Sequence, residues 1–114
     1  ANLLLDARAP NRFAGIEEPL DSVAGHIPGA VNLPWNGNLG TDGRFLPADK
    51  LRERFAAVLG GREPSDVVCY CGSGVTAAHN LLAMEIAGLS GARLYAGSWS
   101  DWILDPSRPV ARGS

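Results

Sequence analysis

Cys71 is the residue whose type and position could do chemistry, because it stands where a strand, a loop and a helix are predicted to meet. The apolar run Val67–Tyr70 indicates a buried strand, the small residues 71–74 form a loop, and residues 75–87 are a helix-forming stretch. Backbone N–H groups converge where such a loop enters a helix, and they favour an anion. A thiol facing them is expected to have a pKa below its free value of about 8.5. The pattern predicts a nucleophilic thiolate.

The residues that follow Cys71 fit this chemistry because they leave room around the sulfur. Two glycines allow positive φ angles and place no side chain between the backbone amides and a group that Cys71 carries. A serine and a threonine add hydroxyl groups beside the same space. An isolated Cys-Gly pair could equally be a turn, so the prediction depends on the whole pattern. The candidate substrate-binding loop comprises Gly72, Ser73, Gly74, Val75 and Thr76.

The other cysteine, Cys69, is expected in the core, on the opposite side of the strand from Cys71. Two cysteines at this spacing cannot supply a disulfide framework. A working thiol therefore favours a reduced, cytoplasmic setting over a secreted one. Sulfur chemistry of this kind requires no metal or organic cofactor.

Composition limits the remaining possibilities. The chain has 114 residues, 46% of them apolar and 19% charged, which is typical of one globular domain. Its net charge of −2 and scattered basic residues argue against a nucleic-acid surface. No apolar run approaches the roughly 20 residues that cross a bilayer. We therefore expect neither nucleic acid nor a membrane among its partners.

The elements that must position Cys71 follow from the apolar pattern. A Leu-rich run opens the chain as a strand buried on both faces, and an amphipathic helix is predicted to end at Gly60 and Gly61. Ser98 is expected to cap a short last helix, with Asp101 completing a capping box. The predicted strands are 1–6, 30–32, 67–70 and 92–96, and the predicted helices are 48–59, 75–87 and 97–102. The loops are 35–47 and 7–24, the latter with at most one helical turn near 11–14, and the tail 106–114 is expected to be poorly ordered unless docked. This alternation predicts an α/β fold, a three-layer α/β/α sandwich with a mainly parallel central sheet.

Three separated motifs resemble the rhodanese superfamily. They are Cys-Gly-Ser-Gly-Val-Thr-Ala at 71–77, Gly-His-Ile-Pro-Gly-Ala at 25–30, and Tyr-x-Gly-Ser-Trp-x-Asp-Trp at 95–102, where the family usually has Glu at Asp101. The first motif is similar to that of 3-mercaptopyruvate sulfurtransferases, whose catalytic domain is the carboxyl-terminal of two rhodanese domains. The resemblance implies a rhodanese catalytic domain over 1–105, without the strand and helix that usually open it, and an amino-terminal rhodanese domain as its partner.

The resemblance also implies a reaction. Cys71 would take sulfur from a small-molecule donor as a persulfide and pass it to a thiol or to cyanide. Arg12, in Arg-Phe-x-Gly, resembles the arginine that holds the carboxylate of 3-mercaptopyruvate, and its planar fork suits a carboxylate. Leu20 stands near the place of a second such arginine, which leaves room for thiosulfate. Thiosulfate-preferring relatives usually place basic residues at positions 72 and 73, and their absence favours 3-mercaptopyruvate.

Other readings of the same residues stay open or are disfavoured. A thiosulfate sulfurtransferase with the same mechanism, or an isolated domain without activity, remains an alternative. A cysteine phosphatase of this fold would need an arginine where Ala77 stands. His26 is expected to lock its turn by hydrogen bonding. His79 is about 12 Å along the helix from Cys71, too far to act as its base.

Overall fold

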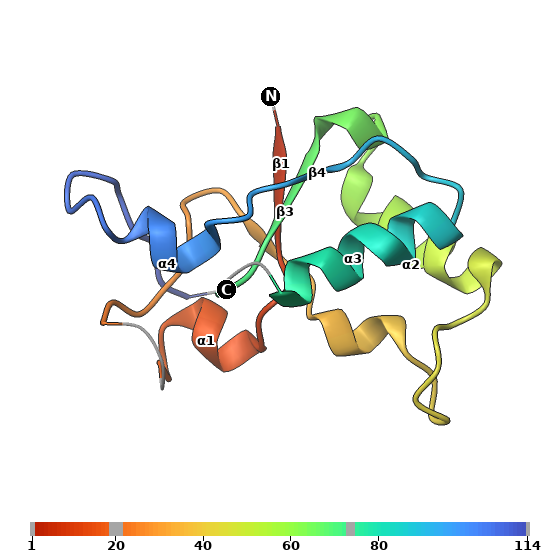
Figure 1. Cartoon of the computed structure of the whole chain (residues 1–114), viewed down its shortest axis with the longest axis horizontal. Helices are drawn as coiled ribbons and strands as arrows, with labels where there is room; N and C mark the ends of the chain where they lie inside the picture. Colours follow the sequence, from red (N-terminus) through yellow and green to blue (C-terminus); the bar gives the residue numbers. More distant parts are fainter. Residues whose placement is uncertain (1, 19–21, 73–74, 114) are drawn as a thin grey trace.

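The computed structural model describes residues 2–18, 22–72 and 75–113, and of Val75 only the backbone. Four parallel strands form its centre (Figure 1). β1 (Leu3–Asp6) and β3 (Val67–Tyr70) lie side by side, with β2 (Val31–Asn32) outside β1 and β4 (Arg93–Leu94) outside β3. Both central strands are buried except at their second residue, as expected for parallel strands covered on two faces. The predicted parallel sheet is confirmed.

Helices cover both faces of the sheet, so that the molecule has three layers (Figure 1). α2 (Ala48–Leu59) and α3 (Val75–Ile86) lie on one side, and α1 (Pro10–Ala14) and α4 (Ser98–Trp102) on the other. The main apolar core lies under α2 and α3, and a smaller cluster lies on the opposite face. The larger cluster includes Leu3, Leu5, Leu51, Phe55, Leu59, Val67, Cys69 and Met84, and the smaller one Ile27, Tyr70 and Trp99.

The long helices follow the predicted pattern. α2 has the predicted bounds, buries Leu51, Phe55 and Leu59, and ends at Gly60 with a φ of 59°, a left-handed conformation that glycine adopts without steric cost. α3 ends at Ile86, one residue earlier than predicted. The short 3₁₀ helix η2 (Pro64–Asp66) leads into β3.

Residues 35–47 differ from the predicted surface loop. They begin with the 3₁₀ helix η1 (Trp35–Asn38), whose last residue is fully buried. Asn38 donates to Asn80 Oδ1 (2.7 Å) and accepts from Arg54 Nε (3.0 Å). Asn80 and Arg54 therefore join η1, α2 and α3 in one polar contact. These partners are 16 and 42 residues away from Asn38, so no local pattern could reveal them.

The carboxyl-terminal segment docks on the domain. Ala111 pairs with His26 through two backbone hydrogen bonds of 2.8 and 2.9 Å, and Gly113 N–H donates to the Ala14 carbonyl (2.9 Å). The Trp102 indole donates to the Pro109 carbonyl (2.8 Å). Among the residues that the structure describes, no helix is long and apolar enough to cross a membrane.

Candidate active site

Cys71 follows β3 directly, and the first turn of α4 holds its backbone. The Cys71 N–H donates to Ser98 Oγ (3.0 Å), and its carbonyl accepts from the Trp99 N–H (2.9 Å). The next carbonyl, of Gly72, accepts from the N–H and the hydroxyl of Ser100 (2.9 and 2.8 Å). Four hydrogen bonds from residues 98–100 therefore fix the chain at the candidate nucleophile.

Ser98 takes a conformation that its residue type rarely adopts. It is fully buried and has a φ of 54°, a strained value for a residue with a Cβ, at a cost of about 1–3 kcal/mol. Its hydroxyl donates to the Tyr95 carbonyl (2.8 Å) while accepting from Cys71. The capping prediction was wrong, because Gly97 is the N-cap, without a side-chain cap, and Asp101 accepts a hydrogen bond from the Tyr95 hydroxyl. Ser98 serves the Cys71 backbone.

The two cysteines are both free thiols, and they lie on the same side of β3. The expectation of opposite sides was wrong, since side chains alternate along a strand and residues two apart share a face. Burial raises the pKa of Cys69 to about 12, so its thiol stays protonated near neutral pH. Cys71 is 2% exposed rather than open at the loop mouth.

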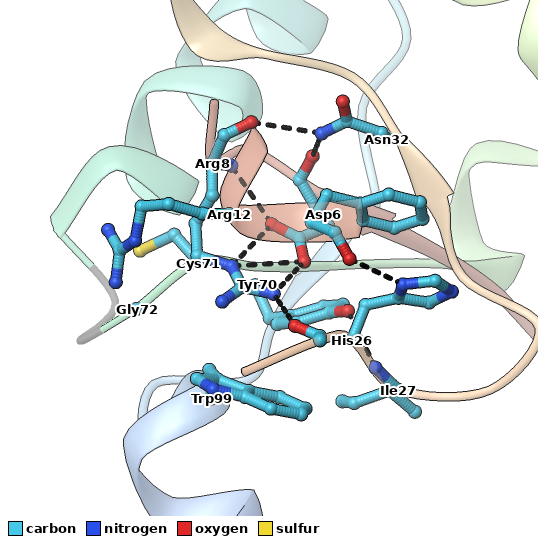
Figure 2. A network of polar contacts seen from close by, with 12 residues as sticks. Asp6, Arg8, Arg12, His26, Ile27, Asn32, Tyr70, Cys71, Gly72 and Trp99 are labelled. Atoms are coloured by element: carbon cyan, nitrogen blue, oxygen red, sulfur yellow. Dashed lines mark hydrogen bonds and ion pairs between the residues drawn. The ribbon is translucent and has the colours of Figure 1, made fainter. Parts of the chain in front are cut away.

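Arg12 reaches from α1 to the loop after β3. Its Nη2 lies 3.1 Å from the point where a Cβ on residue 72 would stand, and Figure 2 shows the guanidinium beside the sulfur of Cys71. Gly72 does not take a positive φ, so the expected conformational role is wrong there. The glycine instead leaves the space that the guanidinium occupies. A cation next to a thiol favours negative charge on its sulfur.

Behind Arg12 lies a chain of four alternating charges, of which Figure 2 shows the inner pair, Asp6 and Arg8. Arg12 Nη2 donates to Glu18 Oε2 (3.0 Å), and Arg8 Nη1 donates to Glu18 Oε1 (3.3 Å). Arg8 in turn donates from Nη2 to Asp6 Oδ2 (2.7 Å) and from Nε to both Asp6 oxygens (3.1 Å each). These contacts link Asp6, at the end of β1, to Arg12 beside Cys71.

The inner pair of this chain is fixed from several sides. Arg8 also donates to the Gly25 carbonyl (2.6 Å) and lies 4.9 Å from the centre of the Trp99 ring. Burial works to lower the pKa of Arg8, but the hydrogen bond and charge of Asp6 outweigh it and raise that pKa. The pKa of Tyr70 is also raised, first by burial and then by the charge of Asp6. Arg8 therefore stays charged and Tyr70 neutral near neutral pH, and the contacts of Arg8 provide a rigid support.

The histidines lie in other contacts. His26 stacks on Phe13, with ring centroids 3.7 Å apart, and its Nδ1 lies 2.7 Å from the Phe13 carbonyl. It therefore has the kind of structural hydrogen bond predicted for it, made to α1. His79 Nδ1 lies 3.2 Å from Asn38 Nδ2, between the rings of Trp35 and Phe45.

Part of the predicted loop lies outside the described residues. These are Ser73 and Gly74, and also Leu20. Val75 begins α3, and Thr76 is half-buried in its first turn. In the parts of the chain that are described, no three His, Cys, Asp or Glu residues are grouped to hold a metal ion.

Two residues of the site were not expected from the sequence. Glu18 belongs to a Glu-Glu-Pro run that indicates a turn, and Ser98 to a helix start. A buried carboxylate between two arginines has no local signal, since its partners are 6 and 10 residues away.

Comparison with models of protein families identifies the family of this chain. The model of the family described as "Rhodanese-like domain" matches residues 1–105. The chain belongs to the rhodanese-like domain family. The rhodanese motifs at 25–30, 71–77 and 95–102 thus meet around the site: His26 joins α1 to the tail, Cys71 follows β3, and Ser98 holds the Cys71 backbone.

Relatives of this rhodanese-like domain include named sulfurtransferases. A protein of Pseudomonas aeruginosa named "Probable 3-mercaptopyruvate sulfurtransferase" is 62% identical over 110 residues, covering 96% of this chain and 39% of its own length. A Mycobacterium tuberculosis protein, SseB, provisionally named a thiosulfate sulfurtransferase, is 49% identical over 97% of this chain and 38% of its own. The structure of 3-mercaptopyruvate sulfurtransferase from Leishmania major matches with a TM-score of 0.81 at 36% identity, over 95% of this chain and 31% of its own. The chain thus spans about two fifths of the length of the two curated relatives and 31% of the Leishmania major chain.

Proposed function

We propose that this rhodanese-like domain, residues 1–105 with the polar tail 106–114, is the catalytic domain of a sulfurtransferase. It takes sulfur from 3-mercaptopyruvate and passes it, through a persulfide on Cys71, to a thiol or to cyanide. The observation that supports this most is the guanidinium of Arg12 beside Cys71, at the carboxyl end of a central parallel strand. Ligands of open α/β sheets bind at that edge.

The reaction has two transfers of one sulfur atom. The Cys71 thiolate attacks the sulfur of 3-mercaptopyruvate, the carbon–sulfur bond breaks, and its electron pair leaves on carbon as the enolate of pyruvate, which takes up a proton. The acceptor thiolate or cyanide then attacks the outer sulfur of the persulfide, and the Cys71 thiolate leaves. Arg12 would bind the donor carboxylate at two points, and residues 72–76 would line the donor and stabilise the persulfide charge.

A second donor is supported by one relative. SseB is provisionally named a thiosulfate sulfurtransferase, and with thiosulfate the sulfur–sulfur bond would break and sulfite would leave. A half-buried guanidinium such as that of Arg12 can bind either anion. Because the chain spans about two fifths of its relatives, we also propose an amino-terminal rhodanese domain as its partner. The free thiols favour a cytoplasmic setting.

The test measures the first transfer directly. The protein is incubated with 3-mercaptopyruvate and, separately, with thiosulfate, and its peptides are mapped by mass. We expect a gain of about 32 Da, one sulfur atom, on Cys71 and none on Cys69, with faster loading from 3-mercaptopyruvate. The Cys71→Ser variant is the control and should gain nothing. Sulfur on Cys69 alone, or on neither cysteine, would contradict the proposal.

A further inference from the structure

Glu18 is a buried carboxylate that the proposed sulfur transfer does not use. Its side chain is 5% exposed, and its two oxygens contact different guanidiniums, Arg8 at 3.3 Å and Arg12 at 3.0 Å. Arg8 is already held by Asp6 at 2.7 Å, with both side chains 1% exposed or less. The positive charge of Arg8 is therefore met without Glu18, and the charge of Glu18 acts mainly on Arg12.

One nitrogen of Arg12 links Glu18 to the loop. Arg12 Nη2 is the atom 3.0 Å from Glu18 Oε2 and also the atom 3.1 Å from the Cβ point on Gly72. The carboxylate thus fixes where the guanidinium lies relative to Cys71. Its negative charge also offsets part of the positive charge of Arg12.

We propose that Glu18 is a specificity-determining residue, which holds Arg12 beside the Cys71 loop and limits its net charge so that a donor with a single carboxylate is preferred to a dianion. The inference deepens the proposed function and rests on it. A carboxylate 3.0 Å from the guanidinium weakens the attraction of Arg12 for the second charge of thiosulfate, while the fork of Arg12 can still pair with a carboxylate. Removing the charge of Glu18 would make the site more positive by one unit charge in a partly buried setting, where charge pairs act more strongly than in water.

The test compares two anions and does not depend on turnover. The rate of Cys71 alkylation by iodoacetamide is measured against rising concentrations of pyruvate, a monocarboxylate, and of sulfate, a dianion. The readout is the pyruvate concentration that halves the alkylation rate, divided by the sulfate concentration that does so. A change in the reactivity of Cys71 itself affects both measurements equally and cancels in this ratio. Glu18→Gln keeps the shape of the side chain. In this variant we expect protection by sulfate to strengthen about tenfold relative to protection by pyruvate.

Two further variants separate charge from packing. Glu17→Gln removes the charge of the exposed neighbour and should keep the parent ratio. Glu18→Asp keeps the charge on a shorter side chain and should stay within about threefold of the parent. This variant decides the matter even if Glu18→Gln does not fold. An unchanged ratio in Glu18→Gln, an equal shift in Glu17→Gln, or a tenfold shift in Glu18→Asp would overturn the proposal.

Failure of the proposed function gives a different result. If the parent loads no sulfur on Cys71 from either donor while the ratio still follows Glu18, sulfur transfer is wrong and the role of Glu18 in anion selection stands. If sulfur loads and the ratio ignores Glu18, only the specificity role fails.

Discussion

Arg12 places a positive charge at the candidate site. Its half-buried guanidinium contacts Glu18 and lies beside Cys71. Arg12→Ala is expected to raise KM for 3-mercaptopyruvate about 10–100-fold, the loss of a charge-assisted pair, with a smaller effect on thiosulfate. Arg12→Lys keeps the charge but not the fork and should recover part of that loss. Initial rates over a range of each donor measure both.

The matched control for Arg12 is the exposed Arg44. Arg44→Ala should leave KM for both donors as in the parent. Equal KM values for Arg12→Ala and the parent would indicate that Arg12 does not bind the donor carboxylate.

The residue types around Cys71 were enough to single it out, and the resemblance of the Arg-Phe-x-Gly motif singled out Arg12. The expected opposite facing of Cys69 and Cys71 was wrong, although strand alternation places residues two apart on the same face. Residue types could not reveal Glu18, since a carboxylate next to a proline is equally compatible with an exposed turn. Its burial depends on Arg8, which Asp6 fixes from another element.

Among the elements, α4 has the most direct influence on the candidate nucleophile. Ser98→Ala leaves the buried Cys71 N–H without its acceptor and should lower the free energy of unfolding by about 1–3 kcal/mol. Ser98→Gly loses the same hydroxyl but relieves the strain at a φ of 54°. We therefore expect Ser98→Gly to be at least as stable as Ser98→Ala in urea unfolding, although alanine is normally the more stable of the two in a helix.

Ser100 provides the comparison for Ser98. It lies two residues along the same helix and does not have a positive φ, so alanine should there be more stable than glycine. The same order at both positions would show that strain at residue 98 is not significant.

Elements with a full apolar face were predicted closely, and those held by distant polar partners were not. The bounds of α2 follow from its apolar spacing and from the glycine that ends it. η1 was missed because Asn38 looks like a loop residue until Asn80 and Arg54 are brought to it by α3 and α2. The capping predicted for Ser98 was wrong for a related reason, because its hydroxyl accepts a hydrogen bond from the backbone of Cys71, 27 residues away.

At the scale of the whole molecule, stability should depend on pH through His79. Burial lowers the pKa of His79 from its ordinary 6.5. A lowered pKa in the folded state means that the neutral form contributes stability above about pH 6.5, which is lost as the pH falls through the folded value. The melting temperature should therefore fall between pH 7 and 5, before most carboxylates titrate.

His79→Gln is the variant that tests this dependence. It keeps a polar group near Asn38 without a titrating ring, so its melting temperature should change less over the same pH range. Parallel curves for the parent and the variant would exclude His79 as the source.

Docking of the carboxyl-terminal segment has a practical consequence for anyone who labels the protein. The backbone of Ala111 is paired with His26, and Gly113 with α1, the helix that carries Arg12. A fluorophore or fusion partner attached to this segment would disturb the position of Arg12 beside Cys71. Because β1 and β3 are parallel, residue 2 and Cys71 lie at opposite ends of the sheet. An attachment before β1 would therefore lie at the end of the sheet away from Cys71.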